Sequence, residues 1–379
     1  MLQYLTPFDS VKDWAIEARL LRWLTFLWLA IGLIVLFSAS YVAADTQYND
    51  GLYYLKRQLV GAFLGLVGFN YVVRSPLRRT LNAAPWIFLF LLGLILLILV
   101  PGVGTEVNGA TRWLSLGPFL LQPSELIKPF LVLQSARVFG QWQRLHKVAS
   151  GLWLLIFAVL LGGILLQPNL STTALCGMSL WLVALAGGLR LRYLGGTALL
   201  GCLVAGVSVS LNEYQWRRIV SFLDPWSDPR GDGYQLVQSL LAVGSGGKWG
   251  TGFGLSQQKL FYLPIQYTDF IFSVFAEEFG FVGSVMLLVL LISYATLALS
   301  VALKCRYQVQ QLVAIGATVF LVGQSLFNIG VATGALPTTG LPLPLFSYGS
   351  NSVIASLLLA GLLVRVARES NEAEVVSIR

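Results

Sequence analysis

Long uninterrupted apolar runs constrain the fold of this chain more than any other feature. Several stretches of about 20 consecutive residues contain almost no charged side chain. A helical run of that length matches the hydrocarbon thickness of a bilayer, whereas a barrel strand needs only about 10 residues of alternating polarity. Because backbone polar groups in lipid must be satisfied within the segment, the runs should be helical. The sequence therefore predicts an all-α polytopic membrane protein.

The composition argues against a soluble domain. Of the 379 residues, 56% are hydrophobic and 11% are charged, and the mean hydropathy is +0.74. Soluble domains carry roughly 25% charged residues. The net charge of +8 does not indicate a nucleic-acid partner, because the basic residues lie in short groups between apolar runs rather than in one stripe. The three cysteines are widely spaced and the single histidine lies in a polar loop, so no disulfide or zinc framework is expected.

The apolar runs predict about ten spans within a single integral membrane domain, residues 1–379. The first run begins near Trp23 after a charged segment and is too long for a signal core, so no cleavable signal peptide is expected. The eighth run is long for one crossing, so its first turns should stand outside the hydrocarbon or tilt. The expected spans are 23–44, 55–73, 84–101, 123–139, 150–167, 171–189, 194–211, 270–303, 310–335 and 345–364.

Charge asymmetry gives the spans an orientation. With the N-terminus inside, every inner connection between spans carries at least two Lys or Arg residues, and most loop acids fall on the other side. This bias predicts that both termini are cytoplasmic. Residues 1–22 are then a cytoplasmic segment, residues 212–269 form a large extracytoplasmic loop between the seventh and eighth spans, and residues 365–379 form a cytoplasmic tail. The end of the chain from Glu369 is expected to be disordered.

The large outer loop contains three different kinds of segment. Residues 224–234, "DPWSDPRGDGY", carry Asp-Pro and Gly-Asp-Gly turn signals. Leu236, Leu240 and Val243 then recur at helical spacing, which predicts a short amphipathic helix on the membrane surface. Residues 244–254, "GSGGKWGTGFG", could cradle a phosphate through backbone N–H groups or could be a flexible connector, and they fit neither the P-loop nor the dinucleotide spacing.

Asp269 opens the eighth apolar run and is the main candidate for chemistry. A charge at the mouth of an apolar segment is costly because it loses hydration there. The carboxylate could cap the helix, or it could lie at the rim of a hydrophobic cavity, where desolvation raises its pKa and suits it to accept a proton. The two roles are compatible. Because the single histidine is His146, in a loop on the other side, a base here must be a carboxylate or another non-histidine group.

Two further polar features lie near the outer ends of expected spans. Glu125 and Lys128 are three residues apart at the start of the fourth span, so they can pair, either fixing two helices or lining an outward-opening cavity. Residues 336–352, "LPTTGLPLPLFSYGSNS", are broken by Pro and Gly, which is tolerated at membrane depth where the backbone lines a cavity. Cations with an acid suit a lipid-linked phosphate carrying a hydroxyl to be activated, but transfer and transport both stay open.

The chain resembles the FtsW/RodA family of SEDS proteins from roughly the second span to the last. Residues 252–264, "GFGLSQQKLFYLP", are nearer the division-type FtsW branch than the elongation-type RodA branch. The motifs that carry the resemblance are "LKRQL" at 55–59, "NGATRWLSLGPFLLQPSELIK" at 108–128, "QPNLSTT" at 167–173, "FLDPWSDPRGDGYQLVQSLLAVGSGG" at 222–247, "LPIQYTDFIFSVFAEEFGFVG" at 263–283 and "LPTTGLPLPLFSYGSNS" at 336–352.

The resemblance implies a ten-span peptidoglycan glycosyltransferase that polymerises lipid II on the outer face of the bacterial cytoplasmic membrane, here in septal synthesis. It implies a class B penicillin-binding protein and other division-complex membrane proteins as partners, and no nucleic acid. Asp269 is then the general base that deprotonates the acceptor sugar's 4-hydroxyl. A divalent cation such as Mg²⁺ or Mn²⁺ could help hold the diphosphate, although no ligand cluster demands one. The implied substrate-binding residues are Arg57, Arg112, Glu125, Lys128, Arg217, Arg218, Lys259 and Ser347.

Two positions depart from the family pattern, and rival functions remain. Tyr267 stands where relatives usually have His before Thr-Asp, so any tuning of the acid by that histidine differs here. Ser350 replaces a glycine of the usual "SYGGS", which puts the local backbone geometry in question. The rivals are a lipid II flippase, an elongation-type polymerase and a non-catalytic scaffold for the crosslinking partner. Clustering of the polar groups in the outer half favours the enzyme over the flippase.

Overall fold

The computed structural model describes residues 14–107, 110–117 and 119–377, and most of these residues are helical. Within these residues, seven helices or helical runs are long and apolar enough to cross a membrane. Most side chains of five of them are exposed, as expected for helices that face lipid, whereas Gln308–Ala332 and Ser350–Ser370 are mostly buried within the bundle. The seven are α1 (Ile16–Tyr48), α3 (Leu77–Ile98), α5 (Lys147–Leu166), α7 (Leu191–Leu211), α10 (Ile271–Lys304), the run Gln308–Ala332, and Ser350–Ser370 within α13 (Ser350–Ser377).

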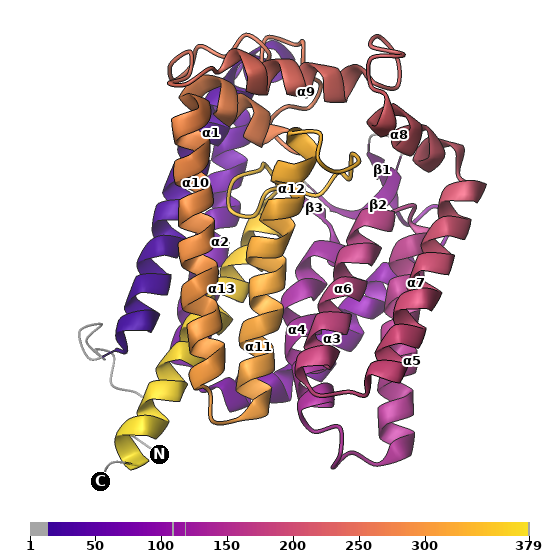
Figure 1. Cartoon of the computed structure of the whole chain (residues 1–379), viewed down its shortest axis with the longest axis vertical. Helices are drawn as coiled ribbons and strands as arrows, with labels where there is room; N and C mark the ends of the chain where they lie inside the picture. The colour runs from indigo at the N-terminus through magenta and orange to yellow at the C-terminus, as the bar shows by residue number, and fades with distance from the viewer. Residues whose placement is uncertain (1–13, 108–109, 118, 378–379) are drawn as a thin grey trace.

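Three further helices run beside these seven: α2 (Tyr53–Arg74), α4 (Pro123–Gly140) and α6 (Leu170–Ala186) (Figure 1). The helix α4 is almost completely buried in the bundle and carries polar side chains on several of its faces. Helix α2 packs along α13, where Gly61 and Gly65 face the α13 residues Ser350 and Leu357 without space for a side chain. The bundle is therefore a helical core of the kind that the apolar runs predict.

The run Gln308–Ala332 changes its helical geometry partway along. It starts as α11 (Gln308–Thr318), passes through the five-residue π-helical segment η3 (Val319–Gly323) and continues as α12 (Gln324–Ala332). A π-helical turn inside an α-helix is rare and frequently occurs at functional sites. The side chains of α12 that contribute to the candidate functional site therefore follow the π-helical segment directly.

Helix α10 is broken at Gly280, where φ is 65° and ψ is −164°. The glycine-rich segment 244–254 packs against the break and satisfies the backbone groups that the broken helix leaves unpaired. It is therefore an ordered brace, and the expectation of a flexible connector is wrong. The N–H groups of Gly250, Thr251 and Gly252 already donate to backbone carbonyls, which argues against the alternative of a phosphate cradle. The bonds that join the segment to α10 run from Phe281 N to Gly247 O, Val282 N to Lys248 O, Thr251 N to Glu277 O and Gly252 N to Glu278 O, at 2.9 to 3.1 Å.

One end of the bundle carries the shorter elements (Figure 1). The predicted short helix that carries Leu236, Leu240 and Val243 is confirmed as α9 (Tyr234–Ser245), and it is preceded by α8 (Glu213–Leu223), which the sequence did not predict. A small antiparallel sheet, ordered β1-β2-β3, corrects the all-helical expectation. It forms because residues 102–122 contain short β-branched and apolar stretches, which favour extended strands that pair with their neighbours. Its strands are β1 (Thr105–Val107), β2 (Ala110–Leu116) and β3 (Phe119–Leu121).

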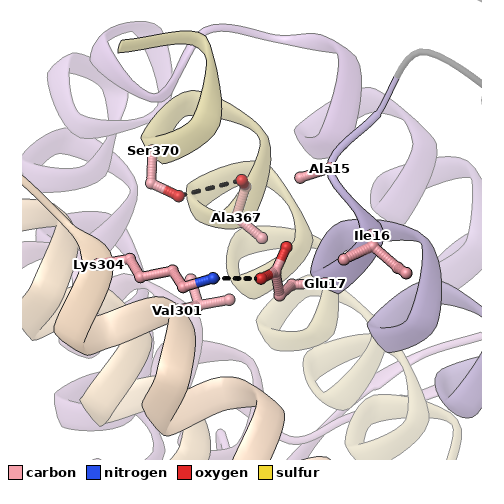
Figure 2. Close-up of a pocket in the computed structure, with 7 residues that line it drawn as sticks. All are labelled: Ala15, Ile16, Glu17, Val301, Lys304, Ala367 and Ser370. Carbon is pink, nitrogen blue, oxygen red and sulfur yellow. Dashed lines mark hydrogen bonds and ion pairs between the residues drawn. The ribbon is translucent and has the colours of Figure 1, made fainter. Parts of the chain in front are cut away.

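The opposite end of the bundle holds the start of α1 and the ends of α10 and α13. A cavity of about 260 Å³ lies among them, and the ion pair between Glu17 and Lys304 crosses it at 2.5 Å (Figure 2). The prediction that the chain is disordered from Glu369 onward is wrong, because α13 continues to Ser377. Glu369 explains part of this order, because its Oε1 accepts hydrogen bonds from Leu77 N and Arg365 Nε. Residues 1–13 of the expected N-terminal segment lie outside the described residues.

Candidate functional site

Asp269 lies immediately before α10, at the end of the bundle that carries α8 and α9. The structure does not use it as a helix cap: the N-cap position is Phe270, and no side chain caps this helix. The residue is half-buried, so its carboxylate is neither in bulk water nor sealed in the core. The backbone of Gly340 passes beside it, and a methyl group placed there would lie 3.5 Å from Asp269 Oδ2. The side chain is thus available for chemistry.

Burial and nearby charges act on Asp269 in opposite directions. Burial raises its pKa above the ordinary aspartate value, and this effect is the largest. The positive charges of Arg218 and Arg112 and a hydrogen bond from Thr268 lower the pKa, but they do not cancel the effect of burial. A carboxylate with a raised pKa accepts a proton more readily than an exposed aspartate does. Asp269 therefore has the electrostatic character of a general base.

Arg112 and Arg218 bring positive charge to Asp269 from two different elements. Arg112, on β2, donates from Nε to Gln167 O at 3.0 Å and from Nη2 to Pro168 O at 2.6 Å, and burial lowers its pKa. Arg218, on α8, donates to the carbonyl of Thr338 at 3.2 Å. Each guanidinium is thus anchored by backbone carbonyls and, among the described residues, is in no salt bridge with a carboxylate, so its charge is suited to an anionic ligand.

Glu125 and Lys128 form a buried ion pair in the first turns of α4, as the spacing predicted. Lys128 Nζ lies 2.6 Å from Glu125 Oε1, and the two side chains are 2% and 5% exposed. Lys128 also donates to Gln324 Oε1 at 3.0 Å, so the pair joins α4 to α12. Of the two roles considered for this pair, the contacts favour the fixing of two helices. Gln324 extends the network toward the 338–342 segment by donating to Pro342 O at 2.7 Å.

Ser347 and Tyr267 hold the segment that contains Asp269. Ser347 Oγ donates to Thr268 O at 2.5 Å and accepts from Leu343 N at 2.8 Å, so its hydroxyl is fully engaged with backbone. The Tyr267 hydroxyl donates to the Tyr54 hydroxyl at 2.9 Å, and the two rings stack at 4.4 Å. Tyr267 therefore contacts α2, and its hydroxyl is not bonded to the acid two residues later. Ser347 acts on the backbone, and no contact here assigns it to a substrate.

Lys259 lies away from the Asp269 group. Its Nζ is 2.8 Å from Glu278 Oε1 and 2.9 Å from Ser38 Oγ, and its side chain is only 6% exposed. Glu278 itself is fully covered. A cation enclosed with its own carboxylate partner has little charge to offer a diphosphate. These contacts favour a structural role for Lys259, which fastens the outer loop to α10, over the predicted role in substrate binding.

In the described part of the chain, two other predicted cations are not among the charges that shift the pKa of Asp269. Arg217 is exposed on α8, with its Nη2 2.5 Å from Glu213 Oε1. It lies one residue before Arg218, so the helix turns the two guanidinium groups toward different surroundings. Arg57 lies on α2, with its Cζ atom 4.8 Å from the ring centroid of Tyr53, and its guanidinium group interacts with the hydroxyl of Tyr348. The charges that act on Asp269 come from Arg112 and Arg218 instead.

Two site residues escaped the sequence analysis: Gln324 and Asn328. Both are buried, and Asn328 Nδ2 donates to Asp269 O at 2.7 Å. The available signal was a pair of amides four residues apart within an apolar run, since buried polar side chains in a span rarely lack a role. Within the described ranges, no cluster of three or more His, Cys, Asp or Glu side chains is placed to hold a metal ion.

The family model described as cell cycle protein, for FtsW, RodA and SpoVE, matches residues 18–372. A probable peptidoglycan glycosyltransferase FtsW from Synechocystis sp. is 58% identical over 380 residues, covering 100% of this chain and 96% of that protein. Stage V sporulation protein E from Bacillus subtilis is 36% identical over 354 residues, covering 92% of this chain and 96% of that protein.

Solved structures agree with these sequence relatives. A chain from a study of how a peptidoglycan synthase complex coordinates polymerization and crosslinking matches with a TM-score of 0.76 and 32% identity, covering 94% of this chain and 98% of that one. Rod shape determining protein RodA from Thermus thermophilus matches with a TM-score of 0.67 and 32% identity, covering 92% and 96%. The predicted resemblance is confirmed, and the chain belongs to the FtsW/RodA/SpoVE family.

Proposed function

We propose that this chain is a peptidoglycan glycosyltransferase that polymerises lipid II at the outer face of the bacterial cytoplasmic membrane, in septal cell-wall synthesis. The names of the relatives, with FtsW at 58% identity over the whole chain, support the reaction and the division role. The observation that carries the proposal is Asp269, a half-buried carboxylate with a raised pKa that faces the charges of Arg218 and Arg112. An acid and two cations suit a sugar hydroxyl and a diphosphate.

In the proposed reaction Asp269 takes the proton from the 4-hydroxyl of the acceptor sugar. The resulting oxygen attacks the anomeric carbon of the donor from the face opposite the lipid diphosphate. A glycosidic bond forms as the bond to the diphosphate breaks, so the configuration inverts and undecaprenyl diphosphate leaves with both electrons. Arg112 and Arg218 stabilise the negative charge that develops on the leaving group, because their guanidinium groups have no carboxylate partner among the described residues.

The topology that fits this reaction has ten spans within one membrane domain and both chain ends in the cytoplasm. The 212–269 segment then lies outside the cell, where lipid II is polymerised. Support comes from the position of α8, α9 and Asp269 at one end of the bundle and of the ends of α10 and α13 at the other. A class B penicillin-binding protein is the proposed partner, with other division-complex membrane proteins around it. The similar chain from a study of a peptidoglycan synthase complex supports a partner of this kind.

The decisive variant is Asp269→Asn, which keeps the side-chain size and removes the base. Purified wild-type protein with its partner should convert lipid II into glycan strands, and the variant should lose at least about 100-fold in rate. The exposed residue Asp45, near the end of α1, supplies the matched control, since Asp45→Asn should polymerise normally. Wild-type rates from Asp269→Asn would reject the assigned base. Wild-type protein that moves lipid II across vesicle membranes without making polymer would favour the flippase.

A further inference from the structure

The segment that carries the proposed base is held at three consecutive carbonyl groups. Each carbonyl accepts one hydrogen bond, and the three donors come from outside the segment. A short segment without secondary structure would otherwise sample many conformations, so three bonds in a row greatly restrict the carboxylate. The bonds run from Tyr348 N to Tyr267 O at 2.9 Å, from Ser347 Oγ to Thr268 O at 2.5 Å and from Asn328 Nδ2 to Asp269 O at 2.7 Å.

Asn328 makes the bond closest to the base and joins it to a second segment. Its Nδ2 donates one hydrogen to Asp269 O and the other to Leu341 O, which lies 2.8 Å away. The side chain is 1% exposed, and its Oδ1 has no hydrogen-bond partner in the described part of the chain. A buried polar atom without a partner costs free energy. The residue is thus poorly explained by stability alone.

Gln324 repeats this arrangement one helical turn earlier. It lies four residues before Asn328 on α12, so both amides project from one face of the helix. Gln324 Nε2 donates to Pro342 O, the carbonyl that follows the one bound by Asn328, and Gln324 Oε1 accepts from Lys128. The π-helical segment directly before Gln324 sets the rotation of this face.

The backbone of residues 338–342 takes part in all of these contacts. Arg218 donates to Thr338 O, Gly340 passes beside the Asp269 carboxylate, and the two amides bind the next two carbonyls. Because Pro and Gly keep this segment out of regular structure, its carbonyls are free to accept side-chain bonds. One segment therefore sets the relative positions of the proposed base, one cation and the buried ion pair.

We propose that Asn328 is a positioning residue for glycosyl transfer, which bonds the backbone of Asp269 to the 338–342 segment and thereby holds the carboxylate against the acceptor hydroxyl. The inference rests on the proposed function. Asn328 is buried behind the segment and acts through Asp269, so it has no direct contact with the lipid-linked sugar. The charges that face the carboxylate are Arg112 from β2 and Arg218 from α8, and the hydroxyl of Thr268 is in its own segment.

The test compares Asn328→Ala and Asn328→Asp in the full chain with its crosslinking partner. Asp has the shape of Asn but lacks both N–H donors. Asn70→Ala is the matched control, because Asn70 is exposed on α2 and its Nδ2 also donates to a backbone carbonyl. For each protein the rate of polymerisation of lipid II is measured as a function of concentration and pH, per folded molecule, together with Tm.

Both Asn328 variants should lower kcat at least about tenfold with little change in KM, because the base loses its position and the ligand keeps its contacts. In Asn328→Ala the acid limb of the pH–rate profile should also move to lower pH, since a released carboxylate is better hydrated and its pKa falls. In Asn328→Asp the added carboxylate repels that of Asp269 and raises its pKa, so the limb should lie at higher pH than in Asn328→Ala. The control should match wild type in all of these measurements.

Two results would overturn the positioning role: wild-type kcat in both variants, or a lower kcat per folded molecule with the acid limb of Asn328→Ala unmoved, because the surroundings of the carboxylate are then unchanged. Asp269→Asn is run in parallel to separate this from failure of the proposed function. If that variant keeps wild-type activity, the assigned base is wrong. If it is inactive while the Asn328 variants behave as wild type, only the positioning role is wrong.

Discussion

Lys259→Met should destabilise the protein while leaving the binding of lipid II by the folded molecules unchanged. The structure pairs Lys259 with Glu278 at 2.8 Å in an enclosed site, where Ser38 is the other close polar neighbour. Methionine keeps most of the length and apolar surface of the lysine but removes its charge. Glu278 is then left buried with one hydroxyl as its only close donor among the described contacts.

The expected loss follows from the cost of an uncompensated buried charge. Removing one partner of a buried ion pair typically costs about 3–5 kcal/mol. An unfolding entropy of about 2.1 cal/mol/K per residue over 379 residues converts about 4 kcal/mol into a fall in Tm of roughly 5 °C. The fall is larger if helices persist in the unfolded state, because the entropy change of unfolding is then smaller. A double variant, Lys259→Met with Glu278→Met, should recover most of the loss.

Thermal unfolding in detergent and the KM for lipid II measure the two roles separately. Lys248 supplies the matched control, because it is an exposed lysine in the adjoining glycine-rich segment, and Lys248→Met should change stability by no more than about 0.5 kcal/mol. A Lys259→Met protein with wild-type Tm and a raised KM would refute the reasoning. Lys259 would then bind the diphosphate, as the sequence alone suggested.

Two further predictions concern the base and the brace on α10. Arg218→Gln removes a charge that lowers the pKa of Asp269, so this pKa should rise. The acid limb of the plot of kcat/KM against pH should then move to higher pH. An unmoved limb would mean that Arg218 lies too far from the base to affect it. Gly280→Ala should lower Tm by at least the equivalent of about 1 kcal/mol, because φ is 65° and the new Cβ collides with the backbone at Gly250. Gly93→Ala, in open space on α3, is its control, and equal Tm values for the two variants would contradict the predicted strain.

The helices were predictable because apolar length is a local property of the sequence. The helix α7 is the clearest case: among its residues only Leu194 is buried, so lipid contact alone explains its apolar composition and its limits lie close to the predicted span. The position of Asp269 before the eighth run was equally visible. Its raised pKa agrees with the sequence argument, since a carboxylate at such a boundary loses hydration.

The partners of individual charges were not predictable, because they depend on contacts between distant segments. The sequence indicates only that Lys259 and Arg218 are cations of the outer loop. In the structure Lys259 is enclosed with Glu278, whereas Arg218 donates a hydrogen bond to the 338–342 segment. The break at Gly280 also escaped the analysis, since a single glycine within an apolar helix gives no sign that another segment packs onto it.

The neutrality of Asn328 and Gln324 follows from the chemistry that Asp269 is proposed to perform. A lysine at either position could also donate to the same carbonyls, but its charge would lower the pKa of the carboxylate and weaken it as a base. An amide donates equally well and adds no net charge. The positive charges that act on Asp269 are instead those of Arg112 on β2 and Arg218 on α8, the two residues that we propose to bind the diphosphate. Neutral amides therefore position the carboxylate, while separate arginines supply the positive charge. This division lets the site bind an anionic substrate and keep a base that is strong enough to accept a proton.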